Sequence, residues 1–228
     1  MKKILQHLMN SRREADHMKI IEGGVTAAKG FEAAATAAGI KYQGRTDMAI
    51  IYSEKPCKVA GTFTTNVVKA APVKWDRQIV ESKQKSQAVI VNSGIANACT
   101  GEEGMKYCEE TAKEAGKVLG IDEKGVLVGS TGVIGMQIPI DKIKAGITEL
   151  AKGKKADLAS GTEAAKAIMT TDTKKKEVAV TFGRRYRSND RRNGERFRND
   201  SSEYVYNACI YYNGCKNFQK STSGGNEQ

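Results

Sequence analysis

The sequence predicts a layered α/β domain over residues 18–182 of the 228-residue chain, with a sheet flanked by helices. Two observations predict this fold class. From Met18 onward, short runs rich in β-branched residues alternate with longer runs rich in Ala, Lys and Glu, as strands and helices do. Apolar residues make up 39% of the chain, which is enough for a core of ordinary size.

The first expected elements are two strands around a turn. Residues 46–53 and 58–65 are rich in β-branched residues, and a Lys-Pro pair at position 55 is a turn signal between them. A helix is expected next, over about 71–83, because Pro72 suits a first helical turn.

The middle of the chain is predicted to hold two strands and a helix. Residues 87–94 form an apolar run that ends in a polar turn, which is typical of a buried strand. Residues 102–120 place apolar side chains three and four apart on one helical face, and Gly120 fits the C-cap. Residues 125–135 read as a strand that runs into a glycine-bracketed turn.

Two helices and a strand are expected in the last part of the domain. Residues 139–153 begin with Pro and end with Gly, as a helix often does. Residues 161–173 are predicted as a helix that leads to a Thr-rich turn, and residues 176–182 as a strand.

The segment 183–228 differs sharply in composition from the rest of the chain. It holds seven of the eleven Arg residues but only two Lys, whereas residues 1–182 hold 24 Lys and four Arg. It has no Leu, no Met and one Ala, so it is expected to be a disordered tail. The net charge of +11 favours a nucleic-acid partner only if this Arg- and Tyr-rich segment is a functional binding arm.

Cysteine and histidine usage limits the chemistry of the chain. The five Cys residues have no zinc-ligand spacing, so reduced thiols in a cytoplasmic protein and no metal are expected. His7 and His17 both lie in residues 1–17, a leader extension or an over-long gene start before Met18. The domain therefore has no His to act as a catalytic base. No signal peptide or membrane segment is expected.

Three polar turns follow apolar or helical runs: 92–101, 129–135 and 169–173. Each is most simply a surface turn. As a functional alternative, Thr131 and Gly132 could supply donors to a developing oxyanion, because small residues leave backbone N–H groups accessible. Thr170, Thr171 and Thr173 are either capping residues or hydroxyl donors to the carboxylate or amide of a small substrate.

Six segments in order resemble the N-terminal half of the ornithine acetyltransferase family, the bifunctional glutamate N-acetyltransferases of arginine biosynthesis. They are "GGVTAAKGF" (23–31), "GTFTTNVVKAAPV" (61–73), "VNSGIANACTG" (91–101), "GSTGVIG" (129–135), "PIDKI" (139–143) and "AIMTTDTKKKEVAVTF" (167–182). Ala28 stands where the family usually has Pro, and Ile95 where it usually has Asn.

The resemblance implies a mechanism that composition and spacing alone do not. In the family, the precursor cleaves itself before a Thr in a "PNMATML"-like segment, and this Thr becomes the N-terminal nucleophile of the β chain. It takes acetyl from N2-acetylornithine, or in some members from acetyl-CoA, and passes it to glutamate. The resemblance assigns Thr131 and Gly132 to the oxyanion hole and Thr170 to substrate binding. It further implies an α2β2 heterotetramer with no cofactor.

The nucleophile segment is absent from the reading frame of the chain but is recoverable from residues 193–220. Ordinary codons for these residues, read one base later, encode "MAKGSGMIHPNMCTMLAFITTDAKIS". For example, GTG TAC AAT for Val205, Tyr206 and Asn207 contains TGT ACA, which encodes Cys-Thr. A one-base change near the codons of Phe182 and Gly183 explains this tail. The chain is therefore expected to be uncleaved and inactive.

Two other hypotheses compete with a frameshifted enzyme. One is an RNA-binding α/β protein whose Arg/Tyr-rich arm engages phosphates and bases. The other is a stand-alone α-like subunit that a separate β chain completes.

Residues 18–182 are expected to expose the sheet edges and the apolar surface that β-chain segments normally cover in the family. Aggregation of this part in isolation is therefore expected.

Overall fold

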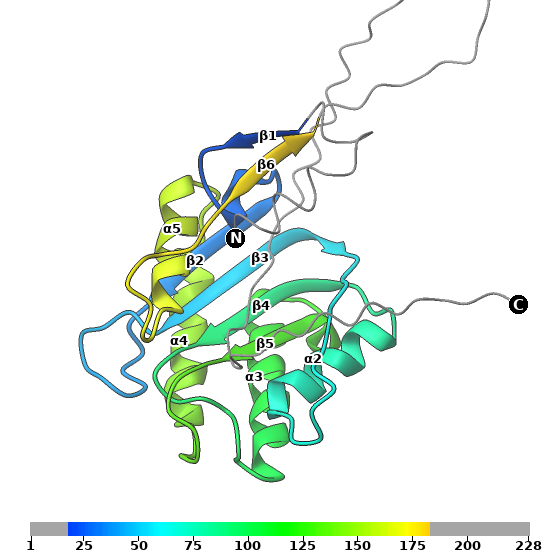
Figure 1. Ribbon diagram of the computed structural model, residues 1–228, viewed down its shortest axis with the longest axis vertical. Helices are drawn as coiled ribbons and strands as arrows, with labels where there is room; N and C mark the ends of the chain where they lie inside the picture. Colours follow the sequence, from blue (N-terminus) through cyan, green and yellow to red (C-terminus); the bar gives the residue numbers. More distant parts are fainter. Residues whose placement is uncertain (1–17, 183–228) are drawn as a thin grey trace, which may run out of the picture.

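A computed structural model describes residues 18–182, and its central feature is a four-stranded mixed sheet (Figure 1). The strands are β2 (Phe31–Thr36), β3 (Met48–Cys57), β4 (Ser86–Asn92) and β5 (Val126–Ser130), in the spatial order β2-β3-β4-β5. β2 and β4 pair antiparallel with β3, whereas β4 and β5 run parallel. The predicted layered α/β class is confirmed.

The register of the sheet gathers several loops at one end. Thr36 is aligned with Met48, Met48 with Asn92, and Asn92 with Ser130. The loops that leave β2, β4 and β5 and the loop that enters β3 therefore meet beyond this row. We call this end of the sheet the loop end.

Helices cover both faces of the sheet. The helices are α2 (Ala71–Glu81), α3 (Glu103–Leu119), α4 (Ile140–Gly153) and α5 (Leu158–Ala167), with 3-10 turns η2 (Val25–Ala27) and η3 (Glu123–Gly125). Alternate residues of β3 point to opposite faces: Ile50 packs in the cluster with α3 and α4, whereas Ala49 packs against α5. The result is three layers, with α2 beside β5.

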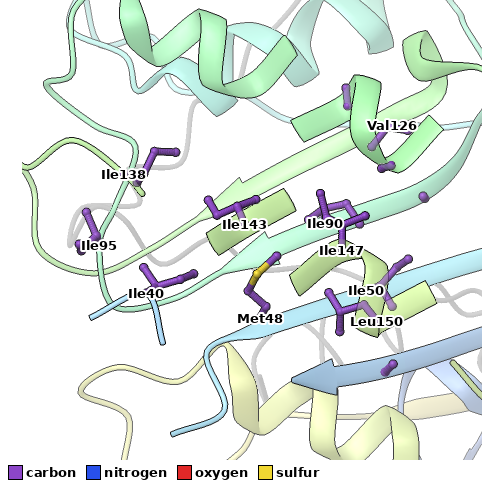
Figure 2. Packing of buried hydrophobic residues seen from close by; sticks show 14 residues of the cluster. Ile40, Met48, Ile50, Ile90, Ile95, Val126, Ile138, Ile143, Ile147 and Leu150 are labelled. Carbon is purple, nitrogen blue, oxygen red and sulfur yellow. The ribbon is translucent and has the colours of Figure 1, made fainter. Parts of the chain in front are cut away.

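The larger core cluster lies between the sheet and the helices α3 and α4 (Figure 2). Met48, Ile50 and Ile90 face Ile147 and Leu150, and all five side chains are essentially inaccessible to solvent. The small residues Ala112 and Ala115 of α3 are also fully buried, so the helix can approach the sheet closely. This packing fixes β4 and β5, the strands that carry the loops considered below.

The predicted strand over 58–65 is wrong. β3 continues through Lys55 and Pro56 to Cys57, where the expected turn lies, and residues 58–65 form no strand. The pairing of β3 with β4 shifts register between Tyr52 and Cys57, which lets a strand tolerate a proline. A strand also needs a neighbour, and 58–65 pairs with none of the described strands.

The other predicted elements are confirmed in kind, with shifted limits at some ends. The helix predicted to lead into a Thr-rich turn within 161–173 begins earlier, at Leu158, because the Asp157 carboxylate caps it by accepting from Ser160 N–H at 2.7 Å. It ends at Ala167, before the Thr-rich turn. The strand and glycine-bracketed turn predicted over 125–135 are present, with the strand ending at Ser130. The strand predicted over 176–182 is β6 (Ala179–Phe182).

Two strands escaped prediction, β2 and β1 (Met18–Ile21). β2 is Ala-rich, a composition that is depleted in strands. β1 pairs antiparallel with β6 in a separate two-stranded ribbon, in which Met18 lies opposite Phe182. The expected leader at 1–17 and tail at 183–228 lie outside the described residues.

Both edges of the four-stranded sheet carry hydrogen bonds within the domain. On the β5 edge, Trp75 Nε1 donates to Val126 O at 2.9 Å and Val128 N–H donates to the Asp76 carboxylate at 2.9 Å. On the β2 edge, Ala33 and Lys155 exchange backbone bonds of 2.9 and 3.0 Å. The expectation of exposed edges is wrong for these positions, because side chains and a loop occupy them.

The expected exposed apolar surface is present in two loops. Val67 and Val68 are 90% and 74% exposed, and Ile134 is 62% exposed in the loop after β5. Single exposed apolar residues are ordinary in folded proteins. Ile20 of β1 is 64% exposed as well, so the apolar exposure is not confined to these loops.

Candidate active site

The parallel pairing of β4 and β5 continues past the ends of both strands. Thr131 N–H donates to Asn92 O at 3.0 Å, Val133 N–H to Gly94 O at 3.1 Å, and Ala96 N–H to Val133 O at 2.9 Å. An isolated parallel bridge joins Ile95 and Val133. The glycine-rich loop after β5 is therefore held along its length by the loop after β4.

This pairing determines which donors remain available in the second loop. Thr131 and Val133 direct their N–H groups to the first loop, so the intervening N–H of Gly132 is not part of the ladder. Among residues 18–182, neither this N–H nor the Thr131 hydroxyl has a hydrogen-bond partner. Gly132 is exposed and Thr131 is half-buried. Two donors therefore lie side by side at the loop end.

Only glycine fits at position 132. Its φ of +133° belongs to a region that L side chains rarely adopt, and a Cβ atom would lie 2.3 Å from the carbonyl carbon and oxygen of Gly94. The small residue thus allows close approach of two backbones and leaves its own N–H exposed.

A buried polar network supports the loop after β4. Asn92 Nδ2 donates to Ile95 O at 2.8 Å, and Ser130 Oγ accepts from Asn97 N–H at 2.8 Å. The Asn97 side chain donates to Gly104 O at 2.8 Å and accepts from Thr100 Oγ1 at 2.7 Å. Buried polar groups are costly unless they are bonded, and these are bonded.

The segment after α5 is tied to the same end of the sheet. Ser93 Oγ donates to Ala167 O at 2.7 Å, and Arg45 Nη2 donates to Met169 O at 2.6 Å. Figure 1 shows this segment, in yellow, beside the blue loop that precedes β3. Half-buried Thr170 follows Met169 directly, so the structure brings Thr170 to the loop end with Thr131 and Gly132.

A shallow depression lies at the loop end, between the loop before β3 and the start of the loop after β4. Its lining residues are Lys41, Tyr42, Arg45, Asp47, Ser93 and Gly94. Asp47 is buried, and its carboxylate accepts from the N–H groups of Ala38 and Ile40 at 2.7 and 2.6 Å, so it shapes the loop before β3. The two cations Lys41 and Arg45 make this rim electropositive. An anionic group of a small molecule would be favoured there.

The cysteine nearest the network is poorly suited to be a nucleophile. Cys108 is fully buried on α3 and lies 3.4 Å from Asn97 Nδ2. Burial, together with the nearby Asp76 charge, raises the pKa of the Cys108 thiol to about 12. Because the thiolate is the reactive form, this side chain is inert at neutral pH. Cys57, Cys99 and Cys108 are free thiols.

Asp76 is the other strongly perturbed group, and it gives a pH-dependent prediction. Burial raises the pKa of its carboxyl from 3.8 to about 7, although the bond from Val128 N–H opposes this shift. The folded state therefore binds a proton more tightly than the unfolded state, and stability is lost as the pH rises from about 4 to 7. We expect Asp76→Asn to stabilise the chain at pH 8 by about 2 to 4 kcal/mol, since a three-unit shift corresponds to roughly 4 kcal/mol.

Urea denaturation of both proteins at pH 4.5 and pH 8 measures this effect. The gain should shrink strongly at pH 4.5, where the carboxyl is mostly neutral. Asp157→Asn is the control of opposite sign, because the bond from Ser160 N–H lowers the pKa of Asp157. A gain for Asp76→Asn that is equal at both pH values would contradict a raised pKa of the Asp76 carboxyl.

The sequence identified the two donor residues but missed their support. Asn92, Ser93, Asn97, Ser130 and Asp47 were not singled out, although all five are buried polar residues. The available signal was the polar "NS" pair directly after an apolar strand, at positions 92 and 93. Thr171 and Thr173 are exposed and take no part in the bonds that tie Thr170's neighbours to the sheet.

The described residues 18–182 also bear on metal and membrane binding. In that range no cluster of three or more His, Cys, Asp or Glu residues could hold a metal ion. Nor does this part of the chain contain a helix that is long and apolar enough to cross a membrane. The proposed RNA-binding arm and the recoverable nucleophile segment fall in 183–228, outside the described residues.

Fold and geometry together define a layered α/β domain in which two donors that are unpartnered within the described residues, Gly132 N–H and the Thr131 hydroxyl, lie beyond the carboxyl ends of two parallel strands. The model of the ArgJ family matches residues 32–190, and the chain belongs to that family, whose members are acyltransferases of arginine biosynthesis. The chain is 48% identical over 160 residues to the arginine biosynthesis bifunctional protein ArgJ of Gloeobacter violaceus. These 160 residues are 70% of this chain and 39% of that protein.

Other relatives give the same picture. The ArgJ protein of Symbiobacterium thermophilum is 48% identical over 165 residues, which are 72% of this chain and 40% of that protein. The chain thus spans about two fifths of the length of the curated relatives that it matches.

Two solved structures are similar to the domain. The crystal structure of ornithine acetyltransferase from Mycobacterium tuberculosis in complex with ornithine is 43% identical, with a TM-score of 0.69, over 72% of this chain and 88% of that one. ArgJ from Bacillus halodurans is 39% identical, with a TM-score of 0.68, over 72% and 85%.

Proposed function

We propose that residues 18–182 form the oxyanion-binding half of an ornithine acetyltransferase, which transfers acetyl from N2-acetylornithine to glutamate. The observation that carries this proposal is the pair of unpartnered donors, Gly132 N–H and the Thr131 hydroxyl, at the loop end of the sheet. Donors that are fixed before the reaction stabilise developing charge without reorganisation.

The proposed reaction has two acyl-transfer steps. The hydroxyl oxygen of an N-terminal Thr attacks the acetyl carbonyl, and the proton of that hydroxyl passes to the α-amine of the same Thr. The tetrahedral oxyanion accepts from Thr131 and Gly132, ornithine leaves as its free amine with the proton, and an acetyl-Thr ester remains. The glutamate amine then attacks this ester through the same oxyanion site, and one of its protons passes by way of the α-amine to the Thr oxygen, which leaves as the free hydroxyl.

Thr170 is proposed to contact the amino-acid part of the substrate. The electropositive rim formed by Lys41 and Arg45 supports this, because both substrates carry a carboxylate. The reaction needs no metal or cofactor, and acetyl-CoA would serve as a second acetyl donor in a bifunctional member. We further propose a cytoplasmic location and, for the complete enzyme, an α2β2 assembly produced by autocatalytic cleavage.

The nucleophile is the part that the printed sequence does not encode in frame. In the proposed account, its codon spans those of Tyr206 and Asn207, and a one-base change near Phe182 moved it out of frame. A Tyr or an Asn cannot replace an N-terminal Thr, because neither becomes a chain terminus whose own amine is the base.

The chain as printed is therefore expected to stay uncleaved and to transfer no acetyl group. Purified protein should run as a single band on a denaturing gel, and an assay of acetyl transfer from N2-acetylornithine to glutamate should show no activity above the buffer control. Two fragments, or measurable transfer, would refute the proposed loss of the nucleophile. Nucleotide sequencing across codon 182 tests the one-base change directly.

A further inference from the structure

We propose that Asn92 and Ser130 are positioning residues that hold the Gly132 donor in place through the backbone carbonyl of Ile95. This inference rests on the proposed acetyl transfer and assigns two residues that the oxyanion site needs but that do not touch the substrate.

The two side chains converge on one acceptor. Asn92 and Ser130 are the last residues of β4 and β5 and lie opposite each other in the ladder. Asn92 Nδ2 donates to Ile95 O at 2.8 Å, and Ser130 Oγ donates to the same oxygen at 3.3 Å. Both residues are at least 96% buried. The carbonyl of Ile95 is thus fixed from two strands at once.

Ile95 and Gly94 form the surface on which Gly132 rests. A Cβ at position 132 would lie 2.3 Å from Gly94 O and 2.8 Å from Ile95 N, so the Cα of Gly132 packs directly on this peptide. The next N–H along, that of Val133, donates to Gly94 O at 3.1 Å. A shift of the Ile95 carbonyl would therefore be transmitted to the direction of the Gly132 N–H.

The Ser130 hydroxyl has a defined orientation. It accepts from Asn97 N–H at 2.8 Å, so its own hydrogen is directed to Ile95 O. Removal of the hydroxyl leaves a buried N–H without its acceptor as well as a carbonyl with one donor fewer. The bond pattern explains why a small polar residue follows the apolar run of β5.

The side chain at position 95 is independent of this arrangement. Ile95 is 5% exposed and packs in the main core, on the side where Ile138 also lies (Figure 2). Since the bonds use only its carbonyl, any L residue at this position would offer the same acceptor. The departure from the Asn that is usual in the family leaves the contacts of Asn92 and Ser130 intact.

Steady-state kinetics of the enzyme made from the one-base-corrected gene test the proposal. Ser130→Ala and Asn92→Asp should each lower kcat about 10- to 100-fold, because a displaced oxyanion donor acts in the transition state, while KM for both substrates stays within about 3-fold. Ser86→Ala is the matched control. Ser86 is equally buried at the opposite end of β4, and its Oγ donates to Gly125 O at 2.6 Å.

The comparison of variants decides between positioning and simple stability. All three variants lose a buried hydrogen bond, so thermal midpoints should fall in all of them, but only the variants at Asn92 and Ser130 should lose kcat. An equal loss of kcat in Ser86→Ala, or an unchanged kcat in both site variants, would overturn the proposal.

Hydrogen–deuterium exchange of the chain as printed separates this proposal from the proposed function. Peptides that contain residues 131–135 should exchange at least about 10-fold faster in Ser130→Ala than in Ser86→Ala, since the support of the loop is lost. If the corrected enzyme is inactive, the acetyl-transfer proposal fails. Equal exchange in the two variants would overturn the support of Gly132 by Ser130, whatever the activity of the corrected enzyme.

Discussion

Correction of the gene by one base near the codons of Phe182 and Gly183 is expected to yield a protein that cleaves itself and transfers acetyl from N2-acetylornithine to glutamate. The reason is the shifted-frame segment "GMIHPNMCTMLAF", which would restore the Thr that we propose as the N-terminal nucleophile. Typical enzymes reach kcat values of about 1 to 1000 per second, so the change from the printed chain should be from no transfer to ready detection.

The matched control is the corrected gene with the restored Thr codon changed to Ala. This variant should keep the fold and the full reading frame but lose both cleavage and transfer. Mass spectrometry of the fragments would place the cleavage site directly before the Thr. An active protein that remains in one piece, or a cleaved Ala variant, would contradict an N-terminal Thr nucleophile.

Gly132→Ala is expected to be the most damaging single change in the loop after β5. The new Cβ would lie 2.3 Å from the Gly94 carbonyl, which is backbone and cannot rotate away, and φ of +133° is strained for Ala. We expect a loss of about 3 kcal/mol in the free energy of unfolding, from backbone strain and overpacking together. In the corrected enzyme, acetyl transfer should fall about 100-fold or more as the donor is displaced.

Gly135→Ala in the same loop separates close packing from backbone strain. Gly135 also has a positive φ, +79°, but no atom lies within 4 Å of its ideal Cβ position. Its substitution should therefore cost only about 1 kcal/mol, the usual penalty of a left-handed conformation. Denaturant unfolding of both variants provides the comparison, and equal losses would refute the close contact of Gly132 with Gly94.

The helices could be predicted well because their signals are local. Met105, Cys108 and Ala112 mark one face of α3 by spacing alone, and Gly120 adopts the left-handed C-cap conformation that a glycine permits. The prediction of a strand over 58–65 is wrong because strand pairing is not a local signal. These residues have strand composition, but pairing depends on a neighbour that is often distant in sequence, and local composition does not reveal one.

The candidate site likewise has a part that local sequence signals predict and a part that they do not. Thr131, Gly132 and Thr170 could be named from short motifs and a family resemblance, since each lies in a polar turn. Their common position at the loop end could not be derived from spacing, because it depends on register and long-range bonds. Asn92 aligns with Ser130, and the Arg45 side chain reaches Met169 across 124 positions. The buried polar support is equally hidden, since an Asn at a strand end looks like any turn residue.

The ribbon of β1 and β6 has a consequence for the order of folding. Met18 pairs with Phe182, so nearly the whole domain must be made and closed into a loop before β1 finds its partner. Such long-range closure costs chain entropy that local pairs do not pay, so this ribbon should be among the last structures to form on the ribosome. β6 ends at Phe182, beside the proposed base change. A shift only a few codons earlier would remove β6 and leave β1 without its partner strand.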